Sequence, residues 1–283
     1  MSFFVKITLC FSSFDSAIFS YDQENCQGLR LSYQGVTKKG EKWHLRNCTY
    51  DDLDVITTLY EDLRVMVHFA GTKTRTSSQT HERLSIIANR YQTGIPKGGW
   101  VIEIGETKEK KFAGLLTIGS SINPRPGRGE IGRVIAFEAQ GSGLGTSVIE
   151  AVVKVIGPEI RRWGIQQEMP LVRERFACFG GEALGEIYVT SAPANVGSWL
   201  TQVRTGFKPV KCPKEENPII LNYESSEIED YETFQKALIT HFKDQGLMPE
   251  KPYKLYDIKG EKRTVSYIQQ YDTVKYHFTY KLS

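Results

Sequence analysis

Apolar and polar residues alternate along this chain with two periods, one typical of β-strands and the other typical of helices. Every second residue is apolar in 3–11 and again in 274–282, which predicts one half-buried strand near each end of the sequence. Because a lone amphipathic strand cannot bury its apolar face, these two strands could share one small sheet.

Between these strands the periods predict a mixed succession of elements. In chain order they are a strand at 43–46, helices at 53–67 and 78–91, strands at 99–104, 111–119 and 130–137, a helix at 145–156, a strand at 186–192, a helix at 196–205, strands at 207–211 and 219–223, a helix at 228–242, and strands at 253–258 and 263–267. Residues 41–224 form the expected core, with an insertion at about 158–184. Residues 1–40 are expected to be a β elaboration, and 225–283 a C-terminal helix plus β strands.

Residue types at the ends of the predicted helices support these boundaries. Thr49 and Asp52 have the spacing of a capping box, in which a hydroxyl and a carboxylate satisfy free helix amides. Gly157-Pro158 is expected to end the helix that begins at 145. Asn195 can cap the helix at 196–205, and Gly206 can take the left-handed conformation that follows its last turn.

Composition and charge exclude several classes of protein. The 36 basic and 33 acidic residues give a net charge of +3, too nearly balanced to indicate a nucleic-acid partner. The five cysteines lack the spacing of metal ligands, so we expect neither a metal site nor a disulfide framework, but reduced thiols in a cytoplasmic compartment. The longest apolar runs are far shorter than the roughly 18 residues of a membrane span. Lys6 interrupts the apolar N-terminus, and no basic leader precedes it, which disfavours a signal peptide.

The sequence Gln-Gly-Ser-Gly-Leu-Gly at 140–145 separates two strongly apolar runs. Three glycines in six residues indicate a structural or binding role that side chains would obstruct. A dinucleotide fingerprint would need glycine at 146, where this chain has Thr146, and the preceding strands are expected to be antiparallel. Residues 127–134 have the glycine spacing of a phosphate loop, but arginine and valine replace its lysine and serine or threonine. Two interpretations remain: an anion site at a helix N-terminus, or a tight turn that needs positive φ at Gly141 or Gly143.

The order of elements and four spaced motifs resemble the GNAT family of N-acetyltransferases, in particular the branch that acetylates ribosomal-protein N-termini. The motifs are Leu45-Arg46 with Thr49 and Asp52, Gly129-Glu130-Ile131-Gly132, the loop at 140–145, and Asn195-x-x-Ser198 leading to Gly206-Phe207. The resemblance covers about residues 43–224. It implies an α+β fold class: a mixed, mainly antiparallel central sheet flanked by helices, here with extra terminal strands.

The resemblance also implies acetyl-CoA as cosubstrate and a primary amine as acceptor. In the family the loop amides hold the pyrophosphate, and the pantetheine arm runs between the fourth and fifth strands. The residues that would contact the coenzyme here are Ile135, Ala136, Phe137, Gln140, Gly141, Ser142, Gly143, Leu144, Gly145, Thr146, Asn195 and Ser198. The acceptor could be a protein N-terminus, a lysine or a small-molecule amine, and a homodimer is possible.

Acetyl transfer needs one group that takes a proton from the amine and one that stabilises the leaving thiolate. Glu130 resembles the family's general base; its other interpretation is a solvated carboxylate paired with Arg128 or Arg133. Ser198 lies where the family often places a group near the coenzyme sulfur, or else its hydroxyl bonds back to a helix carbonyl. Many members have a tyrosine acid where this chain has Gln202, which cannot donate a proton as an acid.

Other polar residues are expected to have structural or surface roles. The five histidines are scattered without metal or triad spacing, and the arginines at 161–162 and 173–175 fit an exposed surface. Glu61 and Asp62 fit a solvated helix face, although they could also attract a cationic amine. The missing tyrosine and the extra terminal strands leave two rival functions: a catalytically silent acyl-CoA-binding regulatory module, and an interaction protein that engages a partner through the flanking sheet.

Overall fold

The computed structural model describes residues 18–22, 27–66, 69, 74–106, 109–121, 124–166, 168–191, 195–210, 252–256, 262–266 and 276–282. Three predicted elements, the strand at 3–11, the strand at 219–223 and the helix at 228–242, lie outside these residues. Within the described residues, no helix combines the length and the apolar character that crossing a bilayer would require.

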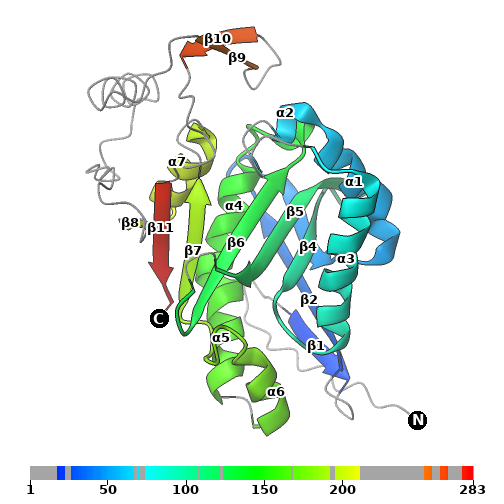
Figure 1. The fold of residues 1–283 in the computed structure, drawn as a ribbon, viewed down its shortest axis with the longest axis vertical. Coiled ribbons are helices and arrows are strands. Elements are labelled where there is room, and N and C mark those ends of the chain that lie inside the picture. Colours follow the sequence, from blue (N-terminus) through cyan, green and yellow to red (C-terminus); the bar gives the residue numbers. More distant parts are fainter. Residues whose placement is uncertain are drawn as a thin grey trace.

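A nine-stranded sheet organises the protein (Figure 1). Its strands are β1 (Ile18–Asp22), β2 (Gln27–Val36), β3 (Lys42–Asn47), β4 (Gly98–Ile104), β5 (Lys111–Ser120), β6 (Arg128–Ile135), β7 (Glu186–Ser191), β8 (Lys208–Val210) and β11 (Tyr276–Lys281). They follow the order β1-β2-β3-β4-β5-β6-β7-β11-β8, and every neighbouring pair is antiparallel except β6 and β7. Strands β9 (Pro252–Tyr256) and β10 (Lys262–Ser266) form a separate antiparallel hairpin, at the two strands predicted for 253–267.

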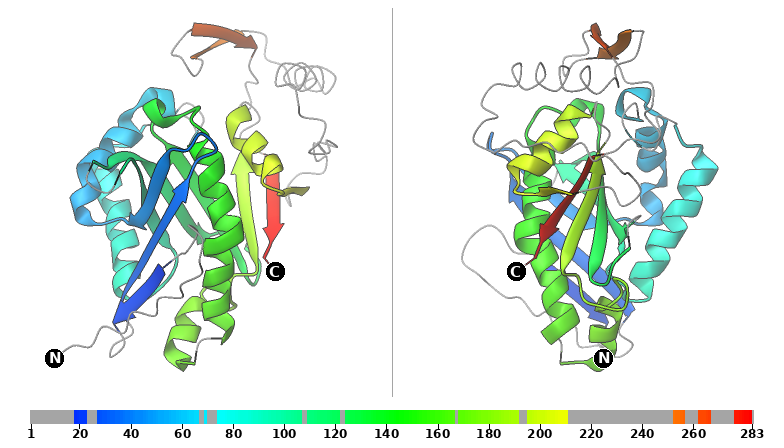
Figure 2. Two further views of the ribbon diagram at one scale, coloured as in Figure 1. Left: turned by 180° about the vertical axis from the view of Figure 1, so that it is seen from behind. Right: turned by 60° about the vertical axis from the view of Figure 1, so that its left-hand side comes forward.

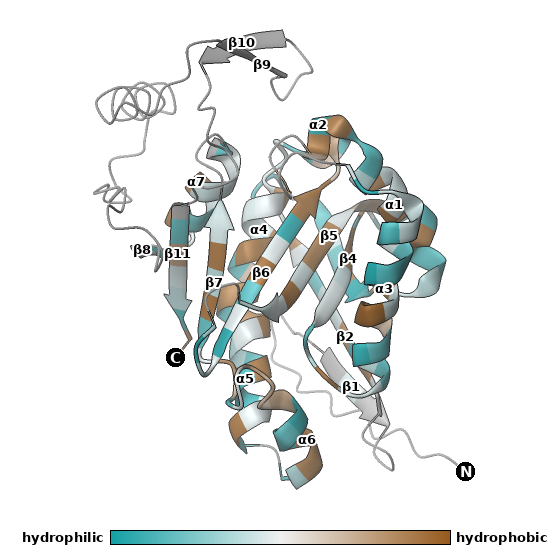
Figure 3. Ribbon diagram, in the orientation of Figure 1, coloured by the Kyte–Doolittle hydropathy of each residue, from teal (hydrophilic) through white to brown (hydrophobic). Residues whose placement is uncertain are grey.

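Helices cover both faces of the large sheet. They are η1 (Tyr50–Asp52), α1 (Leu53–Glu61), α2 (Leu63–Met66), α3 (Ser77–Gln92), η3 (Phe137–Ala139), α4 (Leu144–Ala151), the π-helical segment η4 (Val152–Ile156), α5 (Gly157–Gln166), α6 (Pro170–Phe176) and α7 (Val196–Arg204). Figure 2 shows α1 and α3 on one face and the long α4–α5 helix on the other. Apolar residues concentrate on β5, β6 and β7 between these layers, whereas the outer turns of α3 are polar (Figure 3). The predicted fold class, a mainly antiparallel mixed sheet flanked by helices, is confirmed.

The C-terminal strand lies in an unexpected place. The predicted strand at 274–282 is present as β11, but it lies inside the large sheet, where Phe278 pairs with Val189 of β7 and Pro209 of β8. Phe278 is only 1% exposed, so the strand completes the core. The small separate sheet expected for the two chain ends is therefore wrong for β11. The division at residues 40 and 224 stays a prediction.

The helix expected to end at Gly157-Pro158 continues through both residues. A proline normally breaks a helix because it lacks an amide donor and its ring clashes with the carbonyl one turn earlier. Here the preceding segment is π-helical, with the Gly157 amide bonded to the Val152 carbonyl, and Pro158 falls in the first turn of α5. A side chain at 157 would lie 2.8 Å from the Val152 oxygen and 3.0 Å from the Ile187 side chain. Glycine thus lets this helix pack closely on β7.

The first predicted helix is broken in two at Asp62. The Asp62 backbone is extended, with ψ of 106°, which ends α1. Its carboxylate then accepts the Arg64 amide (2.9 Å), and its carbonyl accepts the Val65 amide (3.0 Å), so Asp62 also starts α2. The break turns α2 toward the end of β6.

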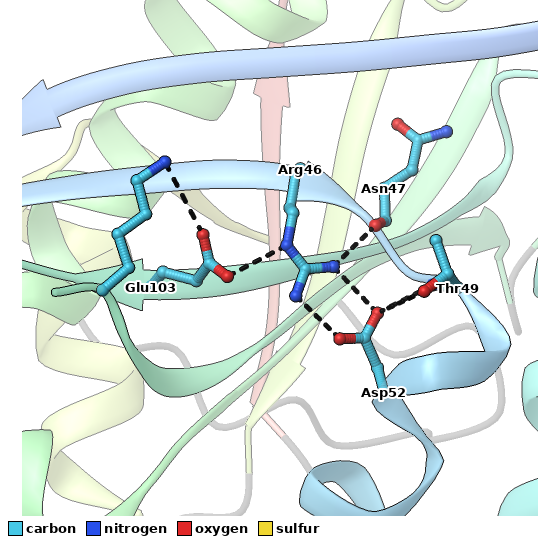
Figure 4. A network of polar contacts seen from close by, with 6 residues as sticks. Arg46, Asn47, Thr49, Asp52 and Glu103 are labelled. Atoms are coloured by element: carbon cyan, nitrogen blue, oxygen red, sulfur yellow. Dashed lines mark hydrogen bonds and ion pairs between the residues drawn. The ribbon is translucent and has the colours of Figure 1, made fainter. Parts of the chain in front are cut away.

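A network around Arg46 ties β3 to β4 and to the start of α1 (Figure 4). The guanidinium donates two hydrogen bonds to Asp52, at 2.9 and 2.7 Å, and one to Glu103, at 2.9 Å. Asp52 also accepts the Thr49 amide at 2.8 Å, which is the carboxylate half of the predicted capping box. Burial raises the pKa of Asp52, but the hydrogen bonds from Arg46 and Thr49 outweigh it and lower the pKa below its ordinary value. The ionised form of Asp52 therefore stabilises the fold.

We predict that Asp52→Asn lowers the free energy of unfolding by roughly 2 kcal/mol near pH 7, because it removes charge-assisted hydrogen bonds from a buried group. The exposed neighbour Asp51 is the control, and Asp51→Asn should change stability by less than about 0.5 kcal/mol. Since the folded-state pKa of Asp52 is lowered, its contribution is present above the unfolded pKa of roughly 4 and is lost as the pH falls below it. Urea unfolding from pH 7 to 3 should show the gap between wild type and Asp52→Asn shrinking; a constant gap would contradict this.

Candidate functional site

Strands β6 and β7 pair at one end and separate at the other. Their parallel register includes only Arg128 with Glu186, Gly129 with Ile187, and Glu130 with Tyr188. Strand β6 continues to Ile135, and the two strands diverge toward their C-terminal ends (Figure 1). Backbone groups that lose a ladder partner in this way need another hydrogen-bonding partner. The separation therefore forms a fork that can accept an extended ligand as an added strand.

The glycine loop lies at the open end of this fork and leads into α4. Gly141 and Gly143 have φ of +74° and +87°, and Gly143 is the N-cap of the helix. The Ser142 hydroxyl donates to the Ala139 carbonyl (2.9 Å) and accepts the Leu144 amide (3.2 Å), while Leu144 is fully buried. The predicted turn with positive φ is therefore present. It aims the first helical amides, which have no acceptors within the helix, out of α4.

Two cations support the loop, and neither was predicted as a site residue. Lys39, in the turn between β2 and β3, donates to the Gly141 carbonyl at 3.0 Å. Arg133 of β6 donates to the Gly145 carbonyl, and a side chain at 145 would lie 3.2 Å from its guanidinium carbon. Burial lowers the pKa of Arg133 to about 10, so it stays protonated at neutral pH. Within the described residues neither cation has a carboxylate partner, so positive charge converges with a helix N-terminus.

Polar residues gather where β6 and β7 begin to separate. Glu130 is paired with Tyr188 on the neighbouring strand, so their side chains lie on the same face of the sheet. The Tyr188 hydroxyl hydrogen-bonds with His277 of β11, and both residues are buried. The Arg128 guanidinium lies 4.8 Å from the centre of the Tyr188 ring and forms an ion pair with Glu186 at 2.6 Å. Arg128 is thus paired with Glu186, and Arg133 reaches the opposite face.

Helix α7 lies beside the end of β7. The Asn195 side chain accepts the Ser198 amide at 3.2 Å, which is the predicted N-cap. The Ser198 hydroxyl is 2.9 Å from the Ser191 hydroxyl at the last residue of β7, rather than bonded to a carbonyl of its own helix. One turn later, Gln202 is 2% exposed, and its side-chain oxygen has no hydrogen-bond partner in the described part of the chain. At the position where many members of the family have a tyrosine, this chain therefore has the buried side-chain amide of Gln202.

Residues 43–208 match the family model of the acetyltransferase (GNAT) domain, a span that covers more than half of the chain. The chain belongs to the GNAT family of acetyltransferases. A comparison with curated proteins gives no match for this GNAT chain.

Solved structures similar to this GNAT chain include three acetyltransferases. A GNAT acetyltransferase from Bacillus anthracis is 12% identical, with a TM-score of 0.44 over 84% of this chain and 94% of that chain. An acetyltransferase from Salmonella typhimurium that modifies the N-terminal serine of ribosomal protein L7/L12 is 11% identical, with a TM-score of 0.46; the match covers 85% of this chain and 95% of that chain. Spermidine N-acetyltransferase from Vibrio cholerae, in complex with CoA and spermine, is 20% identical, with a TM-score of 0.42; the match covers 59% of this chain and 82% of that chain.

The structure brings the predicted site residues of this GNAT domain to one end of the sheet. The loop residues from Gln140 to Thr146 start α4, Ile135 to Phe137 end β6, and Ser198 adjoins the end of β7. Glu130 lies deeper, at the base of the fork. Their roles in binding and catalysis stay predictions.

Sequence reasoning missed the residues that long-range pairing adds to this site. His277 was grouped with the scattered histidines, but β11 places it beside Tyr188. Arg64 of α2 stacks 4.2 Å from the centre of the Phe137 ring and pairs with Glu138 at 2.9 Å, so α2 is fixed next to the end of β6. Only the alternation at 274–282, which placed His277 on a strand, hinted at any of these contacts.

Two other polar side chains have structural contacts, and one departs from its expected place: Asp62 ends α1 and does not lie on a solvated helix face. His44 is a core residue, with its ring nitrogen 3.2 Å from the Gly105 carbonyl oxygen. The described residues hold no group of histidine, cysteine and acidic side chains able to bind a metal. Asp62 is paired with Arg64 at 2.6 Å, and hydrogen bonds from Arg64 hold the pKa of Asp62 below its ordinary value.

Proposed function

We propose that this protein is an acetyl-CoA-dependent N-acetyltransferase that moves the acetyl group to a primary amine by direct attack in a ternary complex. The observation that carries the proposal is the fork between β6 and β7, with a glycine loop and a helix N-terminus at its open end. Such a fork can hold an extended arm between two strands while a helix N-terminus holds its anionic group.

The coenzyme would lie with its pyrophosphate on the loop. The amides of Gly143 and Gly145 would donate to it, and the Leu144 amide would do so by exchanging its bond to the Ser142 hydroxyl for one to the pyrophosphate, as part of the predicted set from Gln140 to Thr146. Lys39 and Arg133 add two positive charges from behind the loop, where no carboxylate of the described residues neutralises them. The edge of β6 that separates from β7, together with the residues that follow it up to Phe137, would pair with the pantetheine, and an amide there would polarise the thioester carbonyl.

The proton chemistry would use both sides of the fork. Glu130 would accept the proton of the attacking amine, directly or through water. Tyr188, whose hydroxyl hydrogen-bonds with His277, is the strand partner of Glu130, and it would orient that carboxylate or that water. Ser198, hydrogen-bonded to Ser191, would stabilise or protonate the departing thiolate, since Gln202 has no acidic proton. The chain thus supplies one candidate group for each of the two steps.

The identity of the amine is a separate part of the proposal. Two similar structures are enzymes for a ribosomal protein N-terminus and for spermidine, and we propose the same broad class, a protein N-terminus or a small-molecule amine, for this chain. The free thiols of Cys48 and Cys178 fit a reducing, cytoplasmic compartment. The buried Gln202 favours one rival, a module that binds acyl-CoA without turnover.

Titration calorimetry with acetyl-CoA tests the binding half of the proposal. We expect saturable heat for the wild type and a loss of at least tenfold in affinity for Gly143→Glu, because a carboxylate would then face the pyrophosphate. Gly181→Glu is the matched control, since both glycines are exposed with φ near +86° and no atom lies within 4 Å of a built Cβ. Equal affinity of the two variants, or no heat at millimolar acetyl-CoA with any protein, would rule out this coenzyme site.

Steady-state kinetics of Glu130→Gln test the chemical half. We expect kcat to fall by roughly 100-fold, in the range found for loss of a general base, with little change in affinity for acetyl-CoA. In the wild type kcat should rise with pH as the Glu130 carboxyl ionises, and this rise should be absent from the pH profile of Glu130→Gln. Unchanged kinetics would exclude Glu130 as the base, and coenzyme binding without any product across a panel of amines would favour the silent module.

A further inference from the structure

The turn between β2 and β3, residues 37–41, packs against the start of α4 close to the glycine loop (Figure 2). The Ser147 hydroxyl of α4 donates to the Val36 carbonyl at 3.2 Å and accepts the indole N–H of Trp43 at 2.9 Å. Both strands that flank the turn are thus bonded to the same helix residue. The turn precedes residue 43, where the match to the GNAT domain begins, so this contact comes from the chain segment before the matched domain.

Hydrogen bonds within the turn fix its shape. The Thr37 amide donates to the Glu41 carbonyl at 2.8 Å, and the Gly40 amide donates to the Thr37 carbonyl at 2.9 Å. The Thr37 hydroxyl accepts the Glu41 amide at 3.2 Å. Gly40 has φ of +84°, which glycine adopts without strain. The backbone of Lys38 and Lys39, between these residues, is therefore held in one conformation beside α4.

The turn presents two exposed lysines, Lys38 and Lys39, at the loop. Lys39 Nζ donates to the Gly141 carbonyl at 3.0 Å, and because an ammonium group has three N–H donors, others can reach a ligand. Neither lysine forms an ion pair within the described residues. The carboxylate that precedes the loop, Glu138, is paired with Arg64 at 2.9 Å. The two lysines thus add accessible positive charge to the loop.

The turn reaches the loop from the side away from the fork. Each neighbouring pair from β2 to β6 is antiparallel, so β2 and β6 run in the same direction. The turn after β2 therefore lies at the same end of the sheet as the loop after β6, whereas β7 lies on the other side of β6. An extended ligand that passes from the fork across the loop continues toward Lys38 and Lys39.

We propose that Lys39, assisted by Lys38, binds the 3′-phosphate of coenzyme A, so that this turn makes the protein selective for the 3′-phosphorylated coenzyme. The inference rests on the proposed coenzyme site and adds the recognition of its nucleotide end. One ribose joins the 3′-phosphate to the pyrophosphate, and a phosphomonoester carries between about 1.5 and 2 negative charges near pH 7. Lysine binds phosphate as a point charge on a flexible stem, so Lys39 can meet this group while its backbone stays beside the loop.

Calorimetry with coenzyme A and with 3′-dephospho-coenzyme A tests this assignment on the full-length chain, because the two ligands differ only in that phosphate. At low salt we expect the wild type to bind coenzyme A about fivefold or more tightly than the dephosphorylated ligand. Lys39→Gln should reduce this ratio to less than about twofold, Lys38→Gln should reduce it by less, and Lys39→Arg should keep most of it. Raising the salt to about 0.5 M should also reduce the wild-type ratio, since exposed charges are screened.

Lys42→Gln is the matched control for a lost positive charge. Lys42 is an exposed lysine of the same hairpin, but it is paired with Glu106 at 2.9 Å. The variant should therefore keep the wild-type ratio of affinities.

The possible outcomes separate this inference from the proposed function. Equal affinity of the wild type for the two ligands would overturn the phosphate site and leave the coenzyme site at the loop intact. If Lys39→Gln weakens both ligands by the same factor, Lys39 only supports the Gly141 carbonyl, and the assignment is again wrong. No heat with either ligand would remove the coenzyme site itself, and this inference with it.

Discussion

The separation of β6 from β7 after the pair of Glu130 and Tyr188 is the constraint on which the rest of the structure depends. A strand that leaves its neighbour loses ladder hydrogen bonds and needs support from its other side. Strand β11 provides it, because it pairs with β7 along the whole of Glu186–Ser191, far beyond the three positions that β7 shares with β6. The C-terminal strand therefore lets the fork open without leaving β7 unpaired.

The helix beneath the fork has a matching role. Gly157 permits the π-helical turn to approach Ile187 and Leu282, so that the long helix braces β7 and β11 while its N-terminus reaches the glycine loop. On the other face, the Arg46–Asp52 pair fixes the start of α1, and Arg64 fixes α2 against Phe137. The glycine loop, the start of α1 and helix α2 are thus held by separate contacts around one gap in the sheet.

Local signals were enough to predict most elements and the loop, because period, capping and glycine conformation depend on neighbouring residues. Asn195 as N-cap and positive φ at Gly141 and Gly143 are examples. The contacts that the sequence did not predict join distant segments: His277 with Tyr188, and Lys39 with the loop. The sequence also did not predict that the helix continues through Gly157-Pro158. Its π-helical turn depends on packing against β7, a distant segment, and not on local helix propensity.

Hydrogen exchange with and without acetyl-CoA tests the central claim, that the fork receives the coenzyme, most directly. Added acetyl-CoA should slow exchange at the free edge of β6, from Ile131 to Ile135, and at the loop amides from Gly141 to Thr146. Strands β3 and β4, on the far side of β5, should exchange as before. Protection elsewhere with none at β6 and the loop, or no change under saturating coenzyme, would contradict the account.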